Sequence, residues 1–174
     1  EDGTQPNPSQ IFVFGSNLAG VHGAGAARAA LEHYGAIFGE GIGLVGMSYA
    51  LPTKDKRIET LPIAQVQVHV ANFKQFAISR PDLNFFVTRV GCGLAGFTDD
   101  QIAPMFRGCP GNCDFPVQWK RYLEPSEVAQ GLVSAYAAGA VGDKDKWIEA
   151  AASELLRLAT EVGVLRVETM KGGA

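Results

Sequence analysis

Ile11-Phe12-Val13-Phe14 leads into the loop Gly15-Ser16-Asn17-Leu18-Ala19-Gly20-Val21-His22-Gly23-Ala24-Gly25, which is followed by the alanine-rich stretch 26–34. Four apolar residues in a row predict a short strand that is buried on both faces. The alanine-rich stretch predicts a helix, and Gly35 is a common residue at a helix end. A strand, a glycine-rich loop and a helix in this order are typical of a phosphate site, because the helix N-terminus presents unpaired amide groups. We therefore expect an α/β domain that holds a phosphate-bearing ligand, first of all a nucleotide.

A second glycine-rich loop repeats this pattern. The apolar stretch 84–90 predicts another buried strand, and it runs into Gly91-Cys92-Gly93-Leu94-Ala95-Gly96-Phe97. Thr98 is suited to cap a helix through Phe106, with two aspartates in its first turn. Loops at the carboxyl ends of parallel strands open toward the same crevice. We therefore expect the first glycine loop (Gly15–Gly25) and the second glycine loop (Gly91–Phe97) to hold one pyrophosphate between them.

Three further elements are predicted before residue 123. Ser48–Leu51 predicts a short strand that ends at Pro52, and Phe115–Val117 predicts a final strand. The apolar residues of 63–79 recur at helical spacing, although those at 66, 68 and 70 also alternate as in a strand. Because Pro62 suits the start of a helix, we favour the helix.

The sequence changes in character from about Leu123. It predicts two helices, at 126–136 and 143–160, and a short strand at 164–167. We therefore expect a nucleotide-binding domain at 10–122 and a C-terminal helical extension at 123–174.

The composition is that of a globular protein, with 47% hydrophobic and 19% charged residues among 174. The net charge of −3 and the lack of a basic stretch argue against nonspecific nucleic-acid binding, which relies on clustered lysine and arginine. No apolar run approaches the ~20 residues of a membrane span, and the polar start of the sequence has no signal-peptide pattern. We therefore expect a cytoplasmic protein without a membrane partner.

The chain has three cysteines, and an odd, low count suits a reducing compartment. Cys109 and Cys113 lie in the sequence Cys-Pro-Gly-Asn-Cys. A structural zinc site needs four ligands, and no second pair follows. We therefore expect a turn that carries two thiols, and neither a metal nor a cofactor.

Both glycine loops resemble the ligand loops of macrodomains, a family that binds ADP-ribose. The stretch 11–27 is similar to the first macrodomain loop, in which an asparagine ends the strand and a glycine run leads into a helix. Val-Thr-Arg-Val-Gly-Cys-Gly-Leu-Ala-Gly-Phe at 87–97 resembles the second, phosphate-wrapping loop, in the form found in the branch that removes ADP-ribose from glutamate or DNA bases. The whole of 11–119 also resembles an uncharacterised group common in bacteria and their phages.

The resemblance implies a three-layer α/β/α macrodomain-like mixed sheet, with ADP-ribose or a related NAD-derived nucleotide in a cleft between the loops. Asn17 matches the asparagine near the distal ribose. An ADP-ribosylated protein or nucleic acid is the partner that the resemblance implies. The implied ligand-binding residues are Gly15, Ser16, Asn17, Gly23, Ala24, Gly25, Gly91, Cys92, Gly93, Leu94, Ala95, Gly96 and Phe97.

The aspartates that macrodomain hydrolases use have no counterpart in this sequence. His22 and Ala24 stand in the first glycine loop, and Ala95 stands in the second. Substitute catalysts are present: histidine is suited to acid–base chemistry near neutral pH, and His22 lies between glycines. Lys54 and Asp55 follow a strand end, where a lysine could neutralise phosphate and an aspartate could activate water.

Three functions stay open at this point. The first is a hydrolase of an ADP-ribosyl derivative that uses His22, Asp55 or Lys54. The second is a non-catalytic reader, or a sequestering module for an NAD-derived signal. The third is a Rossmann-like domain that senses nucleotides, which would be favoured if the two glycine loops lay on opposite edges of the sheet.

Overall fold

The computed structural model describes residues 5–124. The chain divides into two units, residues 1–124 and 125–174, and all that follows concerns the first. The helices and strand predicted beyond residue 125 lie outside the described residues. The division into domains at 10–122 and 123–174 stays a prediction.

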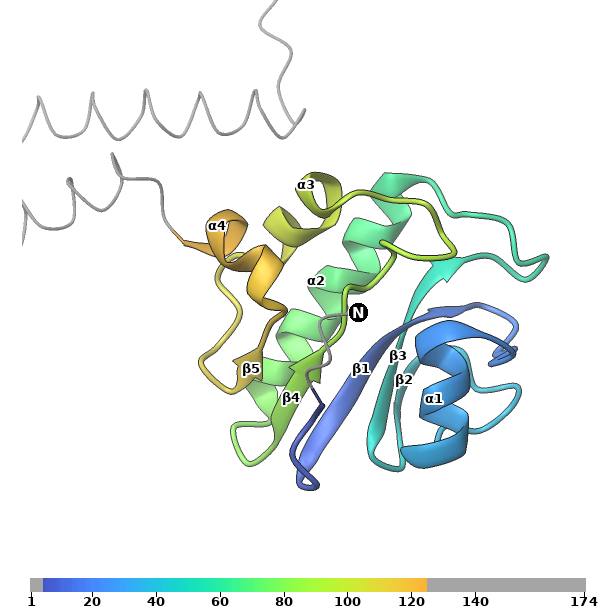
Figure 1. Cartoon of the computed structure of the whole chain (residues 1–174), viewed down its shortest axis with the longest axis horizontal. Helices are drawn as coiled ribbons and strands as arrows, with labels where there is room; N and C mark the ends of the chain where they lie inside the picture. The colour runs from blue at the N-terminus through green and yellow to red at the C-terminus, as the bar shows by residue number, and fades with distance from the viewer. Residues whose placement is uncertain (1–4, 125–174) are drawn as a thin grey trace, which may run out of the picture. The chain divides into compact units, whose positions relative to one another are not determined.

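A five-stranded mixed sheet forms the centre of the described unit, which confirms the α/β class (Figure 1). The central strand β1 pairs in parallel with β3 on one side and with β4 on the other. Strand β5 adds in parallel to β4, and β2 adds in antiparallel orientation to β3. In the order across the sheet the strands are β2 (Gly43–Val45), β3 (Ser48–Lys54), β1 (Gln10–Asn17), β4 (Asn84–Val87) and β5 (Cys113–Asp114).

Helices α1 (Gly25–His33) and α2 (Ile63–Ser79) lie on opposite sides of the sheet (Figure 1). Successive residues of a strand point to opposite faces. Accordingly, Phe12 and Phe14 of β1 pack with the alanines of α1, while Ile11 and Val13 join the larger apolar cluster around α2. The need for apolar side chains on both faces explains why β1 begins as an unbroken apolar run rather than an alternating one.

The helix predicted at 63–79 is confirmed with the same bounds. Its buried residues are Val66, Val70, Phe73 and Ala77, which recur at helical spacing, whereas Val68 is 58% exposed. In a strand, the residues at 66, 68 and 70 would all face the same side, so the exposure of Val68 between two buried valines rules out a strand here. Thr98 is the N-cap of α3 (Asp99–Ile102), which continues into the 3-10 helix η1 (Ala103–Phe106), where Pro104 occupies the first turn.

Several predicted strand bounds are wrong: β1 continues to Asn17, into the predicted loop, and β4 ends at Val87 rather than at Val90. Strand β3 does not end at Pro52 but continues to Lys54, with Pro52 paired opposite Ser16. On its other side β3 pairs with β2 only over Ser48–Ala50, so the amide hydrogen that proline lacks is not needed there. The final strand is β5 and not Phe115–Val117, because Pro116 directly precedes the 3-10 helix η2 (Val117–Trp119).

The short helix α4 (Lys120–Leu123) ends the described part. Within residues 5–124, no helix is both long and apolar enough to cross a membrane.

Candidate functional site

The carboxyl ends of β1, β3 and β4 meet at one edge of the sheet. A Cβ atom added to Gly15 would lie 3.2 Å from the amide nitrogen of Gly91 and 3.5 Å from the hydroxyl oxygen of Thr53. A Cβ atom added to Gly91, whose φ is +77°, would lie 3.1 Å from the ring of Phe97. The backbones of the two glycine loops are therefore packed against each other at this edge, and a side chain at Gly15 or Gly91 would be crowded.

The loops also meet farther out. The side chain of Leu94 comes within 3.9 Å of the position that a Cβ of Gly25 would take, at the start of α1. The Thr60 hydroxyl, in the turn after β3, donates a hydrogen bond to the Ala95 carbonyl at 3.0 Å. Three loops from three neighbouring strands thus form one continuous surface. Its exposed residues include Gly23, Ala24, Gly25, Gly93, Leu94 and Gly96.

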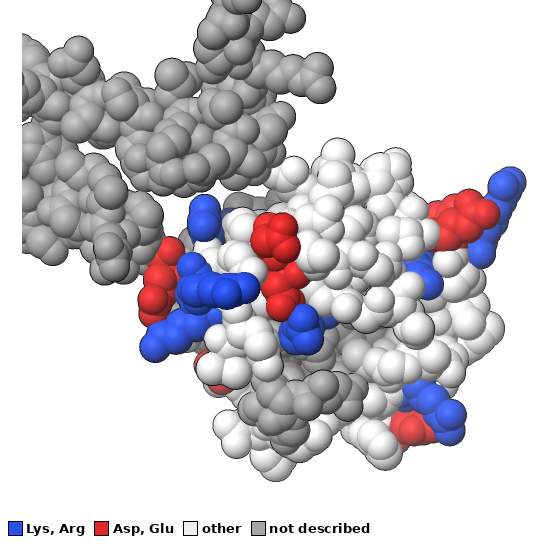
Figure 2. Space-filling view, turned by 45° about the horizontal axis from the view of Figure 1, so that its top comes forward, with Lys and Arg blue, Asp and Glu red and all other residues white. Residues whose placement is uncertain are grey.

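The N-terminus of α1 lies on this surface without a cap. Its N-cap residue is Ala24, which has no side-chain acceptor, and the Ala24 carbonyl accepts from the Arg28 amide. The amides of Gly25, Ala26 and Ala27 have no acceptor within the helix. Figure 2 shows that charged side chains gather in a few groups and that much of the viewed face is uncharged. Neither glycine loop contains a lysine or an arginine, so the donors that the loops themselves offer to an anion are backbone amides, aided by the helix dipole.

Ser16 and Asn17 are buried and hold the first glycine loop in shape. The Asn17 amide nitrogen donates to the Val21 carbonyl at 2.7 Å, and its oxygen accepts from the Val21 amide at 3.0 Å. The Ser16 hydroxyl donates to the Gly41 carbonyl at 2.6 Å. The structure therefore places the two predicted ligand residues at the buried end of β1, where their polar atoms already have protein partners.

The segment 39–41 packs on the first glycine loop, which the sequence interpretation missed. The Gly39 amide donates to the Gly20 carbonyl at 3.0 Å. A Cβ atom on Gly41 would lie only 2.0 Å from the Asn17 carbonyl oxygen, and one on Gly20 would lie 2.3 Å from the Gly39 carbonyl carbon. The glycine cluster at 35–46 was the available signal, because two backbones can approach this closely only through glycine.

His22 is buried beneath this segment. Its ring meets Phe14 edge-on, with 5.2 Å between ring centroids, and Nε2 lies 3.2 Å from the Glu40 carbonyl oxygen. The hydrogen bond to a carbonyl assigns the ring proton to Nε2. Among the described residues, Nδ1 of His22 is the one buried side-chain polar atom without a hydrogen-bond partner. For His22 to act as an acid or a base on a ligand, the first glycine loop would have to open.

Lys54 is the last residue of β3, and Asp55 begins the turn that follows. The Lys54 carbonyl accepts from the Leu18 amide at 3.0 Å, which ties the turn to the first glycine loop. One carboxylate oxygen of Asp55 accepts from the amides of Arg57 and Glu59, at 2.8 and 2.9 Å. The structure thus brings these two residues next to the glycine loops, with the Asp55 side chain shaping the turn.

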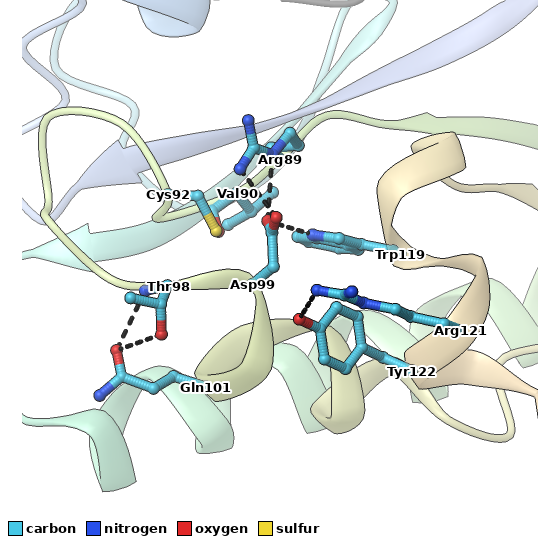
Figure 3. A network of polar contacts seen from close by, with 9 residues as sticks. All are labelled: Arg89, Val90, Cys92, Thr98, Asp99, Gln101, Trp119, Arg121 and Tyr122. Atoms are coloured by element: carbon cyan, nitrogen blue, oxygen red, sulfur yellow. Dashed lines mark hydrogen bonds and ion pairs between the residues drawn. The ribbon is translucent and has the colours of Figure 1, made fainter. Parts of the chain in front are cut away.

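A polar network around Asp99, at the start of α3, anchors both ends of the second glycine loop (Figure 3). The Arg89 guanidinium, just before the loop, donates to both carboxylate oxygens of Asp99, at 3.0 and 2.8 Å. The Trp119 indole donates to the same carboxylate at 2.7 Å. Burial, with Asp99 as the next cause, raises the pKa of the nearby Cys92 thiol to about 12. Cys92 therefore stays protonated at neutral pH and fits a packing role in the loop.

Replacing Asp99 with asparagine is expected to lower the free energy of unfolding by roughly 1–3 kcal/mol at pH 7. Burial alone would raise the pKa of Asp99, but the hydrogen bonds from Arg89 and Trp119 outweigh it and hold the pKa below its ordinary value. A group whose pKa is lowered by folding stabilises the protein above its unfolded pKa, and this contribution is lost as the pH falls through the folded value.

Urea unfolding at pH 7 and pH 3 measures the effect. The difference between the native chain and Asp99→Asn should shrink at pH 3. The exposed neighbour Asp100, changed to asparagine, serves as the control and should stay within about 0.5 kcal/mol of the native chain. An Asp99→Asn difference of equal size at both pH values would contradict the network's ionic character.

Over residues 5–124, no three histidine, cysteine, aspartate or glutamate side chains gather as a metal site would require. In comparisons with known proteins, no family model, no curated protein and no solved structure matches the chain. The function therefore has to be argued from the geometry of the two glycine loops.

Proposed function

We propose that residues 1–124 bind ADP-ribose, or a related NAD-derived nucleotide, across the two glycine loops in a macrodomain-like, three-layer fold. One observation carries the proposal: the loops leave adjacent parallel strands and touch each other, with Leu94 reaching to the start of α1. A pyrophosphate lying along this contact would meet backbone from both loops at once.

The chemistry of the surface suits a pyrophosphate. Gly23 and Gly93 are exposed, and a Cβ atom on either would meet no atom within 4 Å, so folding itself does not require glycine there. A ligand that approaches the backbone closely would explain both residues. The uncapped amides of α1 supply donors and a partial positive charge on the same surface.

The position of the loops in the sheet favours this proposal over a Rossmann-like domain with its loops on opposite edges. The chain leaves β1 toward α1 on one face, while β4 leads to α3, and η1 after α3 packs with α2 on the other. Neighbouring strands whose connections diverge in this way create the crevice in which open α/β sheets bind ligands.

Binding without turnover is the function that the side chains favour. His22 is covered by the 39–41 segment, and an oxygen of Asp55 holds two amides of its own turn. A general base must lie within hydrogen-bond reach of the water that it activates, and in this conformation His22 is not exposed to one. A reader or sequestering module is therefore our first choice, and an ADP-ribosyl hydrolase is the second.

Replacing Gly93 or Gly23 with alanine is expected to weaken ADP-ribose binding at least about tenfold, or roughly 1.4 kcal/mol, without loss of stability. The added methyl group has room in the protein but would displace the ligand. Calorimetry with ADP-ribose, cyclic ADP-ribose and NAD measures the affinities. Gly111→Ala is the matched control, because Gly111 is equally open but follows η1, outside both loops. Equal affinities for Gly93→Ala, Gly23→Ala and Gly111→Ala would contradict the proposed site.

Release of free ADP-ribose separates the two candidate functions. The full chain, incubated with ADP-ribosylated protein, ADP-ribosylated DNA or O-acetyl-ADP-ribose, should bind without releasing ADP-ribose. Release that is abolished by Asp55→Asn or by His22→Ala would instead assign a hydrolase.

A further inference from the structure

The turn between η1 and β5 brings Cys109 and Cys113 together, on the side of the sheet that α2 covers. The Cys109 amide donates to the Phe106 carbonyl at 3.1 Å, and the Cys113 amide donates to the Pro110 carbonyl at 3.2 Å. These successive turns fold the segment back on itself and bring the two thiols close enough for each to shift the pKa of the other. Both cysteines are free, with Cys109 half-buried and Cys113 buried.

The two thiols have different surroundings. The hydrogen bond from Cys113, ahead of the opposing effect of burial, lowers the pKa of Cys109, and the Lys74 ammonium lowers it further. Lys74 is held at this turn by a hydrogen bond to the Arg107 carbonyl. The bond to Cys109, together with burial, raises the pKa of Cys113. Cys109 is thus suited to be the attacking thiolate and Cys113 to be the proton-bearing partner.

The turn is fixed to the protein between the cysteines. The Asn112 amide nitrogen donates to the carbonyls of Ala77, Arg80 and Leu83, at 3.3, 3.1 and 2.8 Å, at and after the end of α2. Asn112 therefore anchors the turn between the cysteines, and its side-chain oxygen accepts a hydrogen bond from the Cys113 thiol at 3.7 Å. This rigidity lowers the entropic cost of joining the two sulfur atoms.

We propose that Cys109 and Cys113 form a reversible disulfide when the protein meets a peroxide. The Cys109 thiolate attacks one oxygen of hydrogen peroxide, the O–O bond breaks, and the departing hydroxide takes up a proton to leave water and a sulfenic acid on Cys109. The Cys113 sulfur then attacks the Cys109 sulfur, the S–O bond breaks, and the hydroxyl leaves as water with the Cys113 proton. The two thiols lose two electrons, which reduce the peroxide, and a dithiol reductant reverses the step by exchange.

Peptide mass spectrometry of the full chain after treatment with hydrogen peroxide tests the proposal. Trypsin cleaves after Arg107, Lys120 and Arg89, so both cysteines lie in the peptide 108–120, while Cys92 lies in 90–107. The peptide 108–120 should become lighter by about 2 Da, the mass of two hydrogen atoms, and regain this mass with dithiothreitol. The peptide 90–107 should keep its thiol.

Two serine variants sharpen the test. Cys113→Ser should stop the reaction at a Cys109 sulfenic acid that dimedone traps, whereas Cys92→Ser should leave the 2 Da loss unchanged. Circular dichroism checks that each variant is folded. The mass of peptide 108–120 from the native chain tests the proposal without either variant. Peptide 108–120 remaining in the thiol form, or Cys92 reacting before Cys109, would overturn the proposal.

Discussion

Gly41→Ala is expected to lower the free energy of unfolding by roughly 2–3 kcal/mol, because the added methyl group would overlap with backbone atoms. Its Cβ atom would lie 2.0 Å from the Asn17 carbonyl oxygen and 3.0 Å from the Gly20 amide nitrogen. Both are backbone atoms of the first glycine loop, so the clash cannot be relieved by turning a flexible side chain. Relief would require separating the 39–41 segment from the loop, which breaks the Ser16–Gly41 hydrogen bond.

Urea unfolding of Gly41→Ala beside Gly23→Ala measures this effect. Gly23 lies in the same loop, but its Cβ atom would meet nothing within 4 Å, so this variant should stay within about 0.5 kcal/mol of the native chain. Gly41→Ala should also bind ADP-ribose more weakly, because the loop that it displaces is part of the proposed site. Equal stability of the two variants would show that the 39–41 segment does not support the loop.

Phe73→Ala is expected to have the largest effect on stability, about 3–5 kcal/mol. Phe73 is fully buried in α2, and its ring contacts those of Tyr49, Phe85 and Phe106. These three residues come from β3, β4 and η1, so the cavity would open where the helix joins the sheet. The free energy of unfolding of a native protein is typically only about 5–15 kcal/mol, so the variant would be left with a small part of it.

Phe38→Ala removes the same ring from the 36–42 segment, where Phe38 is 67% exposed, and should change stability by less than about 0.5 kcal/mol. Denaturant unfolding followed by far-UV circular dichroism gives both values. A loss below about 1 kcal/mol for Phe73→Ala would mean that α2 does not pack on the sheet as described here.

Much of the fold could be predicted because its signals are local. The apolar run at Ile11, the alanine-rich helix and the spacing of Val66, Val70 and Phe73 each report on residues that are close in sequence. Strand β2 had no such signal, since it has only three residues, begins with a glycine and relies on β3 for its pairing. The continuation of β3 through Pro52 also depends on which neighbours the strand has, and this is decided by the whole sheet.

The candidate site, too, could be predicted from local sequence only in part. The glycine loops were predicted from their own residues, and the structure brings them together at adjacent strand ends. The surroundings of His22 and Ser16 could not be predicted, because their partners Glu40 and Gly41 lie far along the chain. Local sequence shows that a loop carries a histidine or a serine, but only the fold shows whether that side chain faces a ligand or another loop.

Nuclear magnetic resonance of the ¹⁵N-labelled full chain, titrated with ADP-ribose, tests most directly whether the two glycine loops form one nucleotide site. We expect the amide signals of 23–27 and 91–97 to shift together and to saturate with a single dissociation constant. Amides of the turn at Cys109–Cys113, which lies outside both loops, should not shift. The absence of shifts, or shifts confined to one glycine loop, would contradict the proposed site.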